Sequence, residues 1–96
     1  MKTRIFSDLH LERITLDAVV PIEENGADLL VLAGDIIHPD YKYYPLLSKL
    51  LEKWTKPVIF VPGNHEFYSP YAMDRQILGF RSWLNQAHPN IHMLLD

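Results

Sequence analysis

Hydrophobic residues gather in four short runs along the chain, and each run is bounded by turn residues. The runs cover residues 3–7, 29–33, 57–61 and 91–95. The two middle runs are almost continuously apolar, which is typical of parallel strands that are covered on both faces. We therefore expect four strands, with the middle two inside a parallel sheet.

The stretch between the second and third runs has the pattern of an amphipathic helix. Its apolar stripe consists of Leu47, Leu50, Leu51 and Trp54. The opposite face carries Lys49, Glu52 and Lys53, which we expect to meet solvent. By contrast, residues 11–25 have no clear period, and we expect an irregular loop there with a short helix.

A longer helix is predicted between the third and fourth runs. Its stripe consists of Met73, Ile77, Phe80, Leu84 and Ala87, with Trp83 beside it. Ser69 is suited to cap its start, Pro70 to its first helical position, and Pro89 to end it. Strands that alternate with helices predict an α/β fold, with a mainly parallel sheet and helical crossovers.

Composition narrows the class of protein. The 96 residues fit one small domain, and 48% hydrophobic with 22% charged residues is ordinary for a folded chain. A net charge of -3 without a basic run gives no strong signal for nucleic-acid binding. The absence of cysteine excludes disulfides and thiolate metal sites. The first apolar stretch is too short for a signal peptide or a membrane span, so we interpret the protein as cytoplasmic, without a membrane partner.

Residues that can bind metals follow each of the first three predicted strands at once. They are Asp8 and His10 after the first strand, Asp35 after the second, and Asn64, His65 and Glu66 after the third. Because the carboxyl ends of parallel strands meet at one edge of a sheet, we expect the three loops to converge there.

Convergence of these loops would bring the carboxylates of Asp8 and Asp35 together. Neither lysine nor arginine occurs in the three loops, so a cation is needed to offset the repulsion. Oxygen and nitrogen donors without sulfur suit Mn, Fe, Zn, Co or Ni. Each motif alone often has a structural role. Their occurrence at three successive strand ends is what predicts a metal site.

The motifs SDLH (residues 7–10), AGD (33–35) and PGNHE (62–66), in this order, resemble the calcineurin-like metallophosphoesterases. The resemblance extends over the whole chain. It implies the N-terminal half of an αββα sandwich, so we expect residues 1–96 to be one metallophosphoesterase domain that is truncated at its C-terminus.

The resemblance also implies a ligand set. Asp8 and His10 would bind a first metal, Asp35 would bridge two metals, and Asn64 would bind the second through its amide oxygen. Two divalent ions are implied, with Mn as the first expectation and Fe, Zn, Ni or Co as alternatives. A metal-bridging hydroxide would then hydrolyse a phosphomonoester, a phosphodiester or a nucleotide.

The same resemblance implies roles for His65 and Glu66. A third residue, His38, is considered because it lies close to Asp35 in the sequence. His65 would lie beside the scissile phosphate, and Glu66 would support that histidine from behind. His38, three residues after Asp35, either lines the site or is a solvated loop residue. We assign no metal to His88 or His92.

The family completes its site with a further histidine and a Gly-His-x-His motif, which are absent from these 96 residues. We therefore expect the chain to bind one metal modestly and a second weakly or not at all. Self-association or a second chain would complete the fold and its hydrolytic site. The alternative is a catalytically inactive metal-binding or interaction module.

Overall fold

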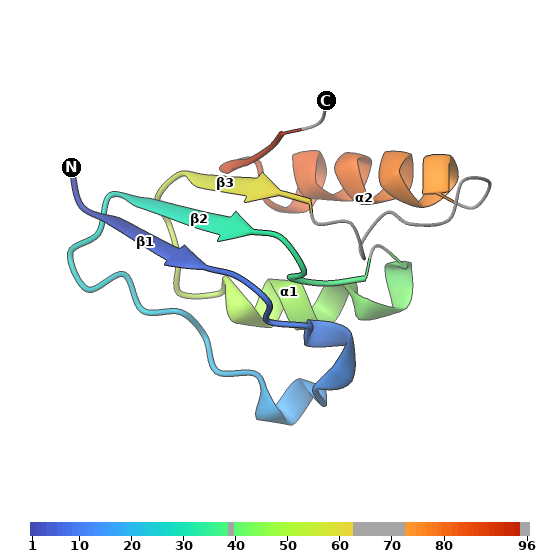
Figure 1. Cartoon of the computed structure of the whole chain (residues 1–96), viewed down its shortest axis with the longest axis horizontal. Coiled ribbons are helices and arrows are strands. Elements are labelled where there is room, and N and C mark those ends of the chain that lie inside the picture. Colours follow the sequence, from blue (N-terminus) through green and yellow to red (C-terminus); the bar gives the residue numbers. More distant parts are fainter. Residues whose placement is uncertain (39, 63–72, 95–96) are drawn as a thin grey trace.

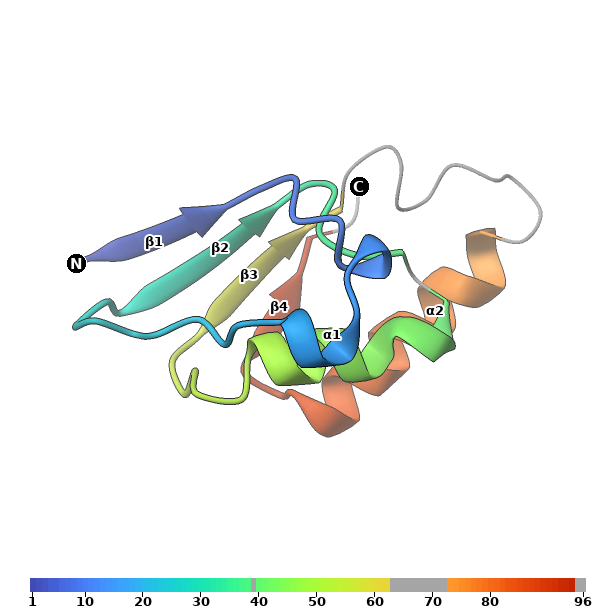
Figure 2. The same cartoon turned by 90° about the horizontal axis from the view of Figure 1, so that it is seen from below.

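The computed structural model describes residues 1–38, 40–62 and 73–94, and for residues 73–77 it describes the backbone alone. Four strands form one sheet: β1 (Thr3–Phe6), β2 (Leu29–Ala33), β3 (Val58–Val61) and β4 (Ile91–Met93). They lie in the order β1-β2-β3-β4, and each neighbouring pair is parallel, as Figure 2 shows. The predicted α/β class and the parallel sheet are confirmed.

Within the described residues, two α-helices and three short 3-10 helices connect the strands. The α-helices are α1 (Tyr44–Leu50) and α2 (Met73–Ala87), and the 3-10 helices are η1 (Leu11–Arg13), η2 (Leu16–Ala18) and η3 (Tyr41–Tyr43). All of them lie on the same side of the sheet (Figures 1 and 2). The irregular segment expected over residues 11–25 is therefore built from two short 3-10 turns and extended chain.

The core lies between the sheet and this one layer of helices. Alternate strand residues point into it and are fully buried, namely Leu30, Leu32, Val58 and Phe60. Phe80 of α2 meets Phe60 edge to face, with ring centroids 5.4 Å apart. Tyr44 at the start of α1 stacks on Trp83 of α2 at 4.3 Å, which joins the two helices.

In the described part of the chain, the apolar stripes of the two predicted helices are largely buried, as expected. Leu47, Leu50, Leu51 and Trp54 are all buried. However, α1 ends at Leu50, because Leu51 leaves the helical conformation (φ -101°, ψ 7°) and the chain turns. The side chains of Leu51 and Trp54 therefore reach the core from the turn that follows the helix.

On α2, Phe80 and Leu84 are buried, and Trp83 lies half-buried beside them. The prediction for Ala87 is wrong, since this residue is exposed. Ala87 is the last residue of α2, and there Trp83 packs against His88 instead, with ring centroids 5.2 Å apart. The side chains of Met73 and Ile77, and the predicted cap at Ser69 and Pro70, lie outside the described residues.

The opposite face of the sheet is apolar and, within the described part of the chain, has no layer over it. Ile5, Val31, Ile59 and His92 pair in one row across the four strands. Ile5 is 67% exposed, and Val31 and Ile59 are half-buried. A one-sided sheet of this kind is consistent with the N-terminal half of a metallophosphoesterase fold.

Among the described residues, no helix combines the length and the apolar character that a membrane crossing requires.

Candidate metal centre

Hydrogen bonds continue the sheet beyond the ends of β1 and β2. The amide of Asp8 donates to the carbonyl oxygen of Gly34 at 3.0 Å, and the amide of His10 donates to the carbonyl oxygen of Asp35 at 2.9 Å. Gly34 in turn donates to Val61 of β3 at 2.8 Å. The arrowheads of the strands point toward this edge in Figure 1. The parallel ladder therefore holds the first two predicted loops side by side.

Three of the predicted ligands meet at this edge. Asp8, His10 and Asp35 each offer a nitrogen or oxygen atom, and these three atoms all lie within 4.8 Å of one another. Asp8 is exposed, whereas His10 and Asp35 are half-buried. A single divalent cation could therefore contact all three side chains from the solvent side.

The backbone at these residues has an unusual conformation. Asp8, His10 and Asp35 all have positive φ angles, of 56°, 46° and 53°, and Gly34 has a φ of 82°. Side chains with a Cβ rarely adopt this region, although Asp, Asn and His enter it more readily than most. The sharp turns out of β1 and β2 are thus made at a glycine and at residue types that tolerate this conformation.

The surroundings of Asp35 fit a bound divalent cation. Its Oδ1 is buried and has no hydrogen-bond partner among the described residues. A carboxylate oxygen that is removed from water without a partner costs free energy, and coordination to a cation removes that cost. Two carboxylates and an imidazole also form a donor set that suits Mn, Fe, Zn, Co or Ni. The residues present therefore fit a divalent metal ion.

His38 does not belong to this cluster. It is half-buried, and its Nδ1 accepts a hydrogen bond from the backbone amide of Asp40 at 3.2 Å. The edge of its ring packs on Tyr43, with centroids 5.7 Å apart. These contacts give His38 a local role in the loop before η3, and its place in the lining of the site stays a prediction.

The third predicted loop, with Asn64, His65 and Glu66, lies outside the described residues. β3, which precedes it, pairs in register with β2, because Val61 lies opposite Ala33. The strand ends that carry Asp35 and the third loop are thus neighbours.

Sequence reasoning missed the contacts of Glu12 and the pair of Ser48 and His88. Glu12 contacts both ligand-bearing loops, and its only sequence signal is an acidic residue two positions after a predicted ligand. Ser48 Oγ and His88 Nε2 form a hydrogen bond of 3.0 Å between residues 40 positions apart, which no local pattern could reveal. Burial lowers the pKa of His88 from its ordinary value of 6.5.

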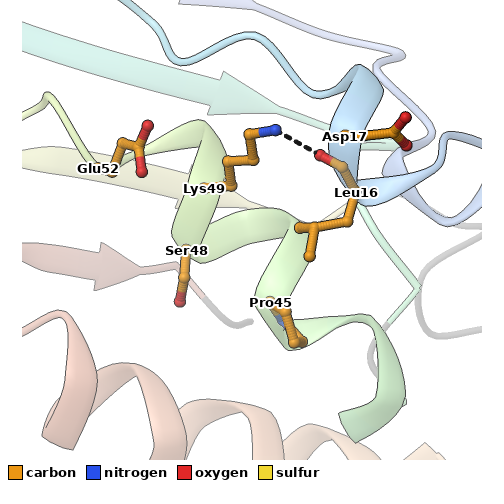
Figure 3. Close-up of a pocket in the computed structure, with 6 residues that line it drawn as sticks. All are labelled: Leu16, Asp17, Pro45, Ser48, Lys49 and Glu52. Atoms are coloured by element: carbon orange, nitrogen blue, oxygen red, sulfur yellow. Dashed lines mark hydrogen bonds between the residues drawn. The ribbon is translucent and has the colours of Figure 1, made fainter.

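An open groove of about 840 Å³ lies elsewhere, between η2 and α1 (Figure 3). It is lined by Leu16, Asp17, Pro45, Ser48, Lys49 and Glu52. Lys49 Nζ donates to the carbonyl oxygen of Leu16 at 2.7 Å, which ties its two sides together. None of the ligand cluster lines this groove. The donor atoms of Asp8, His10 and Asp35 converge at the sheet edge instead.

The fold and the cluster together define a class: a parallel α/β protein with side chains that could hold a metal ion at the carboxyl edge of its sheet. Within this class, the chain belongs to the calcineurin-like phosphoesterase family, whose sequence profile matches residues 1–91. The family acts on phosphorylated substrates and generally uses divalent metals. The resemblance predicted from the three motifs is confirmed.

One similar protein is an uncharacterized protein of Acanthamoeba polyphaga mimivirus. It is 33% identical over 107 residues, an alignment that includes 95% of this chain and 37% of the viral protein. The chain therefore spans little more than a third of the length of this relative. No solved structure matches the chain significantly.

Proposed function

We propose that this chain carries the first part of the active site of a metal-dependent phosphoester hydrolase. A divalent cation, Mn²⁺ in the first instance, would be held by Asp8, His10 and Asp35. The observation that carries this proposal is the meeting of their three donor atoms within 4.8 Å, with Asp35 Oδ1 buried and unpartnered among the described residues.

The finer parts of the proposal concern a second ion and the phosphate. Asp35 would bridge to a second cation that Asn64 contacts, and His65, supported by Glu66, would lie beside the phosphoryl group. When bound, two divalent cations supply Lewis-acid stabilisation of the phosphoryl oxygens and lower the pKa of a water nucleophile. The protein's own part is to hold the ligands in place and to stabilise charge on the leaving oxygen through His65.

The substrate class is a phosphomonoester, a phosphodiester or a nucleotide, in keeping with a family that acts on phosphorylated substrates. Ligands for the second ion beyond Asp35 and Asn64 would come from a longer chain, a partner chain or a second copy. Light scattering tests the last idea, and a monomer at all concentrations would count against it.

A second candidate is a metal-binding or interaction module without catalysis. It is favoured by the cluster among the described residues, where Asp8, His10 and Asp35 would suffice for one ion.

The two candidates are separated by measuring binding and turnover on the same samples. Calorimetric titration with Mn²⁺ should reveal one binding event, and bis(p-nitrophenyl) phosphate and p-nitrophenyl phosphate should report hydrolysis. Asp35→Asn should weaken Mn²⁺ binding by more than about 100-fold, since even outer partners of metal ligands change affinity by about 10- to 100-fold. Asp17→Asn, an exposed residue of η2, serves as the matched control.

Turnover that requires Asp35 would support the hydrolase. Binding that requires Asp35, without turnover, would favour the module. A wild-type chain that binds no Mn²⁺ would refute the proposed hydrolase and the metal-binding form of the module.

A further inference from the structure

A carboxylate outside the predicted ligand set lies between the two ligand-bearing loops. Glu12 belongs to η1, and its side chain is 22% exposed. Its Oε1 accepts a hydrogen bond from the backbone amide of His38, in the loop after β2, at 3.0 Å. Its Oε2 lies 3.6 Å from Nδ1 of His10, in the loop after β1. One side chain thus contacts both loops, with a separate oxygen for each.

The contact with His10 has a chemical consequence. A neutral imidazole carries its proton on one nitrogen and a free lone pair on the other. A carboxylate next to Nδ1 stabilises the proton at Nδ1, so Nε2 keeps the lone pair that a metal needs. The separation of 3.6 Å is within ion-pair range and slightly longer than a hydrogen bond.

A role in loop closure alone does not account for the carboxylate. The hydrogen bond that joins the two loops uses Oε1. The oxygen of a glutamine amide would accept from the His38 backbone equally well. Arg13 is a weak alternative partner, because its Nε lies 3.9 Å from Oε2 and its side chain is 75% exposed. The negative charge of Oε2 is therefore best explained by His10.

We infer that Glu12 is a positioning residue for the metal centre, which holds His10 in the tautomer that is protonated at Nδ1. By fixing the tautomer and the ring, it raises the affinity of Asp8, His10 and Asp35 for a divalent cation. The effect on affinity rests on the proposed function, whereas the tautomer is a property of the metal-free chain.

Glu12→Gln provides a sharp test. It keeps an oxygen that accepts from the His38 amide, and it replaces the acceptor that faces His10 with a donor. Its amide oxygen would accept from the His38 backbone, which leaves the amide NH₂ to donate to His10 Nδ1. That arrangement favours a proton on Nε2, the nitrogen that should bind metal. Glu12→Ala removes both contacts, and Glu52→Gln, an exposed residue just after α1, is the matched control.

The tautomer of His10 can be read from long-range ¹H–¹⁵N correlation spectra of the metal-free chain at about pH 8.5, where unperturbed imidazoles are neutral. A His10→Asn variant assigns the signals. Wild type and Glu52→Gln should show the proton on Nδ1, and Glu12→Gln should show it mainly on Nε2. In calorimetric titrations, Glu12→Gln should bind Mn²⁺ about 10- to 100-fold more weakly than wild type.

A Glu12→Gln chain with the wild-type tautomer would overturn the inference, and so would unchanged Mn²⁺ affinity in a wild type that binds the ion. If the wild type binds no Mn²⁺, the proposed function fails, and the NMR result alone decides the role of Glu12. Circular dichroism shows whether each variant is folded. Should Glu12→Ala unfold, Glu12→Gln carries the test.

Discussion

The amide of His10 donates a hydrogen bond to the carbonyl oxygen of Asp35 at 2.9 Å, so two proposed ligands from different loops are joined through their backbones. The loops are held together by the sheet itself, because this bond extends the ladder between β1 and β2. The sheet therefore holds the two ligand-bearing loops near each other. Such preorganisation reduces the ordering cost of metal binding.

Asp35→Asn should separate metal binding from fold stability. In the metal-free chain the substitution removes repulsion from Asp8, and asparagine tolerates the positive φ of 53°, so the melting temperature should stay equal or rise. Mn²⁺ at 100 times the wild-type Kd should stabilise the wild type by about 2.7 kcal/mol, and should stabilise Asp35→Asn by less than about 0.4 kcal/mol.

Thermal denaturation with and without Mn²⁺ measures both effects. Asp17→Asn should respond to Mn²⁺ as the wild type does. A fully retained metal response in Asp35→Asn would contradict the proposed ligand role.

Phe80→Ala should destabilise the fold strongly. The side chain is fully buried and contacts the rings of Phe60, Tyr44 and Trp83, so truncation leaves a cavity between the sheet and the helices. We expect a loss of about 3–5 kcal/mol in the free energy of unfolding. Urea denaturation followed by circular dichroism measures this loss. Leu78→Ala, at a position that is 66% exposed on the same helix, should change stability by less than about 0.5 kcal/mol.

Gly79→Ala should stabilise the chain. Gly79 lies within α2, and an added Cβ would meet Tyr44 Oη at 3.7 Å, an ordinary van der Waals contact. A gain of about 0.5–1 kcal/mol is expected from the lower entropy of the unfolded chain.

The matched substitution Gly26→Ala should have the opposite sign. Nothing lies within 4 Å of the added Cβ, but a φ of 78° is strained for alanine, at a cost of about 1–2 kcal/mol. Urea denaturation of both variants shows whether the space around the added Cβ or the backbone conformation decides the change in stability. Equal shifts of the same sign would show that this conformational reasoning is wrong.

His88 should make stability depend on pH. Burial lowers its pKa in the folded chain, so as the pH falls below 6.5 the unfolded chain binds a proton first. The unfolded state then carries more protons, and the free energy of unfolding falls with falling pH. The contribution of His88 to the free energy of unfolding is fully present above pH 6.5. It is lost as the pH falls through the lowered pKa of the folded state.

Urea denaturation at several pH values from about 7.5 to 5 tests this dependence across the unperturbed pKa of histidine. His88→Gln should flatten the curve in that window, while it can still hydrogen-bond to Ser48. His92→Gln, at an exposed position of β4, should leave the slope in place. A slope that persists unchanged in His88→Gln would assign it to another group.

The elements of the fold could be predicted because buried apolar residues recur along the sequence at the spacing of a strand or a helix. The fully buried residues of β2 and the stripe of α1 are visible as apolar patterns, and parallel pairing brings Asp8 and Asp35 to one edge. Glu12 could not be found this way, since its contacts depend on how η1 turns the chain back between two loops. The pair of Ser48 and His88 depends on how α1 and α2 pack, which no local period encodes.

The left-handed backbone at Asp8, His10 and Asp35 affects how mutagenesis of this centre should be interpreted. Alanine at these three positions would impose conformational strain as well as remove a donor atom, so an alanine scan would exaggerate their chemical importance. Asparagine is the cleaner replacement for the two aspartates. Glycine is the reference that isolates the backbone from the side chain.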